Sequence, residues 1–173
     1  MPQVVHHHKR FRPIPAVVII VLLVVLVVGL WQAYVWMQAA QAKSNYNAAM
    51  ASVQGLDEHS KYAAAQTVLQ NYLHTNPPTK YRYTALLLLG DLAYDNRQDT
   101  VAVQDYKQAI AANGGKMTEI AAEDIGQAAA SAGDKATALT YYKQALALTI
   151  SQPGVSNDAA DLQATVQNLE SSQ

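Results

Sequence analysis

The sequence of 173 residues contains no cysteine. Without a thiol the chain can form no disulfide, offers no thiolate nucleophile and cannot build a thiolate metal site. This absence is compatible with either side of a membrane. The length is enough for one domain of ordinary size.

Acidic residues are absent from the first part of the chain. All 13 aspartates and glutamates lie beyond residue 42, whereas Lys9, Arg10 and Arg12 lie near the start. From residue 43 onward, nine basic residues stand against 13 acidic ones, a formal net charge of −4. A mildly acidic domain is poorly suited to a phosphate backbone, so the composition argues against nucleic-acid binding.

Charged residues are also absent between residues 13 and 42, where a long apolar run lies. Residues 14–37 form 24 nearly uninterrupted apolar positions. A helix rises about 1.5 Å per residue, and roughly 20 apolar residues span a bilayer core. Trp31, Tyr34 and Trp36 lie at the far end, where amphipathic rings favour the headgroup layer. We therefore expect a basic cytoplasmic tail at 1–13, a transmembrane helix at 14–37 and an exported remainder.

A cleavable signal peptide is the alternative for this segment, because Ala40–Ala42 has the small-x-small form of a cleavage site. The apolar run is longer than the roughly 7–15 residues of a signal peptide, which favours an uncleaved anchor. The adjacent His6, His7 and His8 are interpreted as a weakly basic flank, and no metal site is predicted.

The remainder of the chain shows helical periodicity and no strand pattern. Turn or cap residues separate the segments at Gly55, Asn76–Pro78, Asn113–Gly115, Gly133 and Pro153–Gly154. Ser156 is a suitable N-cap for the last helix. Helices are expected at 38–54, 59–74, 80–95, 99–112, 117–132, 135–149 and 156–170, and the first can continue the apolar helix without a break.

A four-residue segment that occurs twice indicates an internal repeat. "YKQA" occurs at Tyr106–Ala109 and again, 36 residues later, at Tyr142–Ala145. The alignment of residues 83–116 with 119–152 also pairs Gly90 with Gly126 and Ala102 with Ala138. Each unit is then a pair of antiparallel helices, which buries its apolar face only by stacking on its neighbours.

Small residues recur because helix backbones must approach closely. A glycine within a helix costs about 1 kcal/mol relative to alanine, which is reasonable where a partner helix comes near. A tyrosine four residues after a small residue lies on the same helix face and can fill the gap between units. The predicted packing residues are Gly90, Ala102, Tyr106, Ala109, Gly126, Ala138, Tyr142 and Ala145.

This pattern resembles the tetratricopeptide repeat (TPR) family, which has a glycine in helix A and a small residue, an aromatic and an alanine in helix B. The usual helix A aromatics are missing, since Leu86 and Ala122 take one such position and Ala93 and Ala129 the other. Repeats are expected at 46–79, 83–116 and 119–152 within residues 38–155, followed by a capping helix and tail at 156–173. The resemblance implies an all-α solenoid behind the membrane helix.

Catalytic groups are not evident in this sequence. His59 and His74 lie near helix ends, and a histidine near a helix C-terminus interacts favourably with the helix dipole. Asp91 and Asp95 share a helix face, and the preferred interpretation is a solvated surface rather than acid–base or calcium chemistry. Gly114–Gly115 is interpreted as a helix end. We expect no enzyme activity, cofactor or metal.

The resemblance implies a groove, lined by helix A residues, that holds a peptide or a partner helix. Its polar and acidic lining lacks a basic clamp for a carboxylate terminus, so a basic or amphipathic protein segment fits better. By position, the groove residues are Asn47, Met50, Gln54, Thr84, Leu87, Asp91, Tyr94, Asp95, Ile120, Glu123, Gln127 and Ser131.

Two hypotheses of function follow from this layout. The first is a single-pass scaffold of the plasma (inner) membrane, whose exported repeats recruit a protein to a cell-envelope machine. The layout is similar to that of small membrane-anchored bacterial TPR proteins, such as ancillary subunits of the secretion translocon. The second is a structural subunit whose repeats fill their own groove and form a homo-oligomer.

Overall fold

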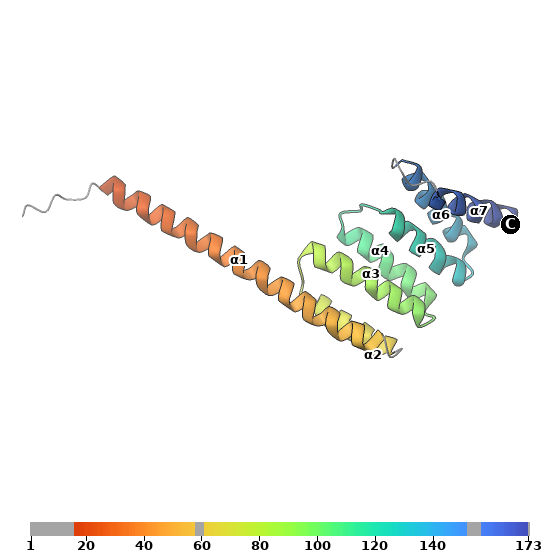
Figure 1. Cartoon of the computed structure of the whole chain (residues 1–173), viewed down its shortest axis with the longest axis horizontal. Coiled ribbons are helices and arrows are strands. Elements are labelled where there is room, and N and C mark those ends of the chain that lie inside the picture. Colours follow the sequence, from red (N-terminus) through yellow and green to blue (C-terminus); the bar gives the residue numbers. More distant parts are fainter. Residues whose placement is uncertain (1–15, 58–60, 152–156, 173) are drawn as a thin grey trace, which may run out of the picture. The chain divides into compact units, whose positions relative to one another are not determined.

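The chain, in this computed structural model, is described over residues 16–57, 61–151 and 157–172. Across these ranges the regular elements are seven α-helices, with no strand (Figure 1). The all-α class predicted from the sequence is therefore confirmed. The predicted tail at 1–13, His59 and the proposed N-cap Ser156 lie outside the described residues.

The first helix, α1, runs without a break over Ala16–Asp57. It includes both the apolar segment and the helix expected at 38–54. The break predicted at Gly55 is wrong, because the helix continues for two residues beyond it. One glycine costs a helix only about 1 kcal/mol, and the same turn is held by the buried Val53 and by Leu56, which packs beside it.

The chain divides into two units, with the boundary between Gln41 and Ala42. In the first unit, the large apolar side chains from Val18 to Met37 are all exposed, by 43–72% of their surface. Judged by length and composition, α1 is the one helix in the described part of the chain that could cross a membrane.

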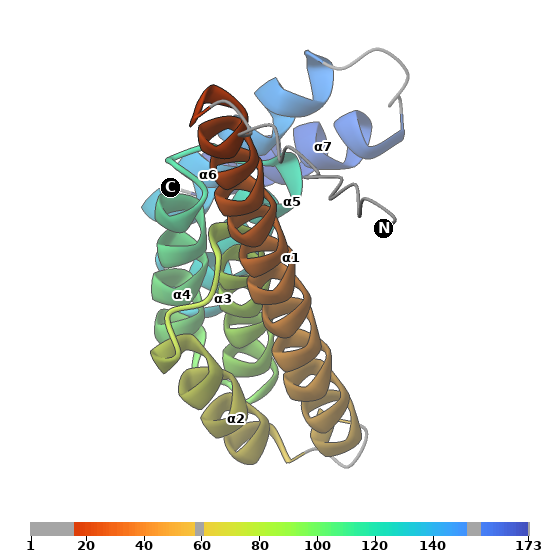
Figure 2. The ribbon, with the colours of Figure 1, turned by 90° about the vertical axis from the view of Figure 1, so that its left-hand side faces the viewer.

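The second unit continues with helices that each pack against the next one along the chain. Figure 2 shows α3 and α4 side by side. The observed bounds are close to the predicted ranges: α2 is Tyr62–His74, α3 Thr79–Asp95, α4 Asp99–Ala112, α5 Glu119–Ser131, α6 Lys135–Ile150 and α7 Asn157–Ser171.

Two N-caps that were not predicted lie at the starts of α5 and α6, which form the third helix pair. The Thr118 side chain accepts a hydrogen bond from the Ala121 N–H, and Asp134 accepts one from the Thr137 N–H. A side-chain oxygen at this position satisfies a backbone donor that the first helical turn leaves unpaired. These caps define the first residues of α5 and α6.

The core of the second unit consists mainly of small and aliphatic side chains in three clusters. The first lies in α1 to α3, the second in α3 to α5, and the third in α5 to α7. Ala102, Ala109, Ala138 and Ala145 are completely buried. Such small side chains let neighbouring helix backbones lie close together. The three clusters follow one another along the row of packed helices.

Gly90 and Gly126 lie directly against the rings of Tyr106 and Tyr142. A Cβ atom on Gly90 would stand only 2.5 Å from Cε1 of Tyr106, and one on Gly126 would stand 3.1 Å from Cδ1 of Tyr142. Tyr106 is only 3% exposed, whereas Tyr142 is partly exposed. The first contact therefore has far less freedom to relax than the second.

We expect Gly90→Ala to destabilise the second unit, because the buried Tyr106 ring must move. Overpacking of this kind costs about 1–3 kcal/mol, which outweighs the gain of about 1 kcal/mol in helix propensity. Gly126→Ala is the matched control and should be close to neutral. Urea unfolding of residues 42–173 measures both. Equal free-energy changes for the two variants would contradict this account of the packing.

Candidate protein-binding face

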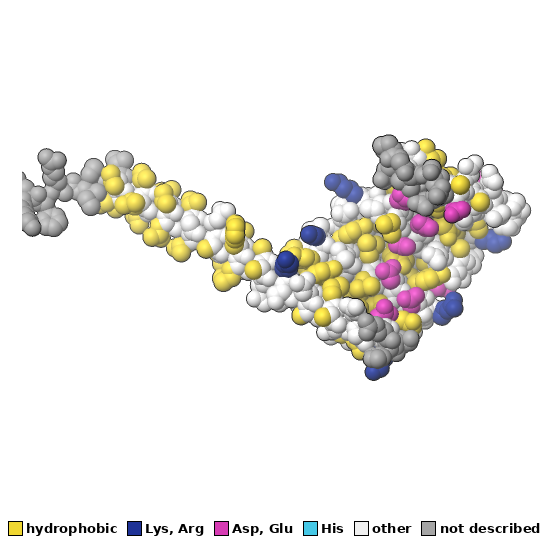
Figure 3. All heavy atoms as spheres, in the orientation of Figure 1, with side chains coloured by type: hydrophobic (Ala, Val, Ile, Leu, Met, Phe, Trp, Pro, Cys, Tyr) yellow, Lys and Arg dark blue, Asp and Glu magenta, His cyan; other side chains and the backbone are white. Residues whose placement is uncertain are grey.

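One surface of the second unit is formed by the first helix of each pair, namely the Ala42–Asp57 part of α1 together with α3 and α5. We call it the A face; α7 continues it beyond α5. Figure 3 looks onto this surface and shows a stripe of acidic side chains across it, with lysine and arginine side chains towards its edges. Asp91 and Asp95 from α3 and Glu123 from α5 are exposed carboxylates of this surface.

The predicted groove residues lie on the helices expected for them. Nine of the twelve are exposed, while Met50, Leu87 and Tyr94 are partly buried and pack against the core clusters. Ser131 is engaged as well, since its hydroxyl donates to Oδ2 of Asp99 at 2.9 Å. These four side chains help to hold the repeats together.

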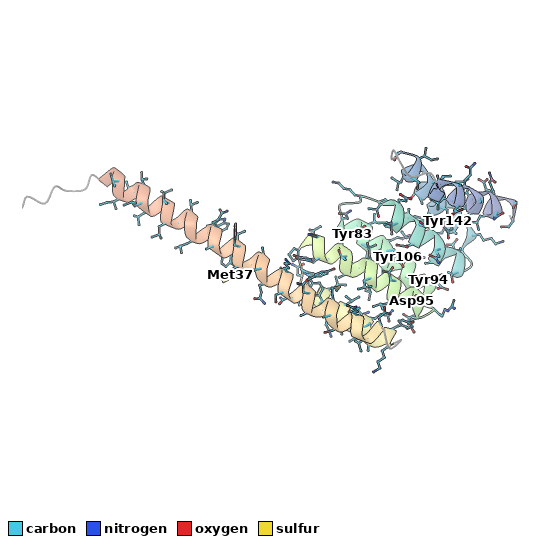
Figure 4. The ribbon with its side chains drawn as sticks, in the orientation of Figure 1. Met37, Tyr83, Tyr94, Asp95, Tyr106 and Tyr142 are labelled. Carbon is cyan, nitrogen blue, oxygen red and sulfur yellow. The ribbon has the colours of Figure 1, made fainter. Side chains whose placement is uncertain are left out.

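Asp91 links the A face to the buried tyrosine below it. The Tyr106 hydroxyl donates to Oδ1 of Asp91 at 2.8 Å. Burial raises the pKa of the Asp91 carboxyl, the Tyr106 hydrogen bond lowers it, and the nearby Asp95 and Asp57 raise it again. Figure 4 shows Tyr94 and Asp95 on α3 close to Tyr106. Asp91 therefore has a structural role in addition to any contact with a partner.

Asp124 is the most perturbed carboxyl of this surface. Burial, together with the negative charges of Asp91 and Glu123, raises its pKa to about 6. Sequence reasoning did not single out this residue. A raised pKa arises when a carboxyl loses water and faces other carboxyls, and that depends on neighbours from another repeat.

A pocket of about 310 Å³ opens beside α5, between it and α6 and α7. Of the predicted groove residues it contains Glu123 and Gln127, which lie one helical turn apart on α5. Sequence analysis missed the other four lining residues because it treated the last helix only as a cap and Tyr142 only as packing. The lining consists of Glu123, Gln127, Tyr142, Asp161, Leu162 and Thr165.

A group of three tyrosine rings lies at the start of the helix row. The rings of Tyr46 and Tyr81 stack with centroids 4.8 Å apart, and Tyr46 also meets Tyr72 at 6.1 Å. The buried Tyr72 hydroxyl has no hydrogen-bond partner in the described part of the chain. This group anchors α1 and α2 against α3.

Across residues 16–57, 61–151 and 157–172, no group of three or more histidines, aspartates and glutamates is placed to hold a metal ion. The polar groups of the A face are suited to hydrogen bonds and ion pairs with another molecule.

The raised pKa of Asp124 gives a pH-dependent prediction. A carboxyl whose pKa is higher in the folded than in the unfolded chain favours folding at low pH, and this contribution is lost as the pH rises through the folded value. Asp124→Asn should therefore stabilise the second unit at pH 7.5 and make little difference at pH 3.5. One pKa unit corresponds to about 1.4 kcal/mol, so the gain has an upper limit of about 3 kcal/mol.

Urea unfolding of residues 42–173 at both pH values measures this difference. Asp134→Asn is a useful comparison, because the pKa of Asp134 is lowered by its hydrogen bonds to Thr137. That variant should lose stability at neutral pH. An Asp124→Asn effect that does not change between the two pH values would refute the assignment.

Known proteins with the same fold support the repeat assignment. PcrH in complex with the chaperone-binding region of PopD is 18% identical, with a TM-score of 0.61 over 75% of this chain and 93% of that one. SycD, the type III secretion translocator chaperone of Yersinia enterocolitica, is 15% identical, with a TM-score of 0.59 over 75% and 83%. PcrH from Pseudomonas aeruginosa alone gives 18% identity and a TM-score of 0.56 over 75% and 92%. At these identities the likeness concerns the fold.

Family membership rests on the sequence itself. No curated protein has a recognisably similar sequence. The tetratricopeptide repeat pattern, however, matches residues 50–116 and 87–153, which together cover more than half of the chain. The resemblance inferred from Gly90, Tyr106 and their counterparts in the next unit is thus confirmed, and the chain belongs to the tetratricopeptide repeat family.

Proposed function

We propose that this protein is a membrane-anchored adaptor whose A face binds a segment of another protein. The observation that carries the proposal is the combination of an acidic, pocket-bearing repeat surface and a long apolar helix on one chain. The partner segment is a peptide or a helix, basic or amphipathic in character. The protein then acts by recruitment to a membrane or cell-envelope assembly and not by catalysis.

Membrane anchoring is supported by the exposure of the apolar helix. Side chains such as Leu23, Val27 and Leu30 are each more than half exposed. An uninterrupted apolar surface of this size is costly in water and marks a membrane or protein contact. Trp31 and Tyr34, whose ring centroids are 6.5 Å apart, suit the headgroup layer at the end of a span at 14–37.

Protein binding is supported by the charge of the A face. Among the described residues, the ion pair is Lys143 with Glu170 at 2.6 Å, so Asp95, Glu123 and Asp161 have no cationic partner. Unpaired carboxylates on a protein surface favour a cationic ligand and disfavour nucleic acid. PcrH, which shares the fold, has been seen with the chaperone-binding region of PopD; by analogy, this chain binds a protein segment.

The membrane proposal can be tested by cysteine labelling, since the chain has no cysteine of its own. Thr100→Cys introduces a single thiol at an exposed position of α4, and Gln3→Cys introduces one in the N-terminal tail. With the tail in the cytoplasm, a membrane-impermeant maleimide should label Thr100→Cys in intact spheroplasts and Gln3→Cys only after permeabilisation. The reverse pattern, or release of the chain from membranes by carbonate, would contradict the proposal.

The adaptor proposal can be tested by photo-crosslinking in native membranes. Benzoylphenylalanine at Tyr94 and at Gln127, both on the A face, should capture the same protein partner. The same group at Gln104, an exposed position of α4, is the control and should not capture it. If the A face positions yield only crosslinks between copies of this chain, the protein is instead a self-associating structural subunit. Equal capture at Gln104 would exclude the A face as the binding surface.

A further inference from the structure

The pocket beside α5 combines two carboxylates with an aromatic ring and an apolar side chain. Glu123 comes from α5, Tyr142 from α6, and Asp161 from α7. Glu123 and Asp161 are both exposed, so their charges reach the opening of the pocket. Three helices that are separate in sequence thus supply one small, negatively charged site.

The apolar part of the pocket is formed by side chains that pack on the core. The Tyr142 ring lies against Gly126, and both Tyr142 and the buried Leu162 pack around the third core cluster with Ala122 and Ala145. A ring in this position offers an aromatic surface on which a flat cation can stack. Leu162 can cover an aliphatic stem.

The charges of this pocket are not neutralised within the described part of the chain. Burial raises the pKa of the Tyr142 hydroxyl, and the negative charge of Glu123 raises it further. The two lysines of α6 are engaged elsewhere, since Lys143 pairs with Glu170 and Lys135 donates to the backbone oxygen of Ser172. The pocket is complementary to a cation that must come from outside.

The volume indicates what kind of cation fits. About 310 Å³ corresponds to roughly ten water molecules and lies at the lower end of ligand pockets, which begin at about 300 Å³. This is space for one long side chain rather than for a folded segment. A guanidinium group suits it better than an ammonium group, because its planar fork can donate to two carboxylates while its face stacks on an aromatic ring.

We propose that this pocket holds an arginine side chain of the segment bound on the A face. Glu123 and Asp161 accept hydrogen bonds from the guanidinium group, Tyr142 stacks on its plane, and Leu162 covers its stem. Gln127 and Thr165 add neutral hydrogen-bonding groups at the wall. This inference rests on the proposed protein binding and names the residue by which the partner is anchored.

The test uses the full chain in nanodiscs of zwitterionic lipid and two small probes. N-acetyl-arginine N-methylamide carries the guanidinium group, and N-acetyl-citrulline N-methylamide is its neutral counterpart of nearly the same shape. Methyl NMR signals of Leu162 and Thr165 should shift and saturate with the arginine probe and stay unchanged with the citrulline probe. Equal shifts with both probes, or none with either, would overturn the proposal.

Matched charge variants distinguish binding of the arginine probe in the pocket from general electrostatic attraction to the acidic surface. Glu123→Gln combined with Asp161→Asn should weaken binding of the arginine probe about tenfold, equivalent to about 1.4 kcal/mol. Asp57→Asn combined with Glu119→Gln removes the same charge from sites that do not line the pocket and should change the affinity less than twofold. If the two double variants weaken binding equally, the arginine probe responds to overall charge and the pocket assignment is wrong.

The outcome is independent of the crosslinking experiment. If crosslinks form at Tyr94 and Gln127 but the arginine probe fails, the A face binds its partner by other contacts. If the arginine probe binds but no crosslinks form, the pocket is a guanidinium site and the adaptor function fails.

Discussion

Close approach between paired helices is the constraint on which the rest of this structure depends. At Gly90 there is no room for even a methyl group beside the Tyr106 ring. Because the ring is held there, the hydroxyl of Tyr106 on α4 reaches Asp91 on α3. The same arrangement at Gly126 brings Tyr142 to the wall of the pocket. The contacts that pack the helices therefore also position residues of the candidate binding surface.

Much of this fold follows from local sequence. The repeated glycine and tyrosine predict the helix pairs because such residues satisfy a steric need that recurs in the second and third units. Helix ends follow from turn residues such as Gly133, whose φ of +81° suits glycine. Gly55 shows the limit of this reasoning, since a glycine stops a helix only when packing on either side fails to hold it.

The candidate site was less predictable because it depends on contacts between repeats. Glu123 and Gln127 could be placed on a helix A surface by position alone. Asp161 and Thr165 could not, since their role depends on how α7 packs against α5 and α6. The raised pKa of Asp124 likewise arises from burial and from the negative charge of Asp91 in the preceding repeat. Periodicity gives the direction of a side chain within one helix, whereas charges and pockets depend on the neighbouring helix.

The alanine-rich core has a consequence for how the repeats open. A buried alanine removes little apolar surface from water, so each helix contact contributes only a modest part of the cohesion. In a linear array, the outermost helix has a neighbour on one side only and opens most easily. Within the described residues, α7 is the helix at the C-terminal end of the array, and it supplies Asp161, Leu162 and Thr165 to the pocket. Amide exchange at the C-terminal end therefore reports on the integrity of the pocket, and an occupant that bridges α5 and α7 would slow it.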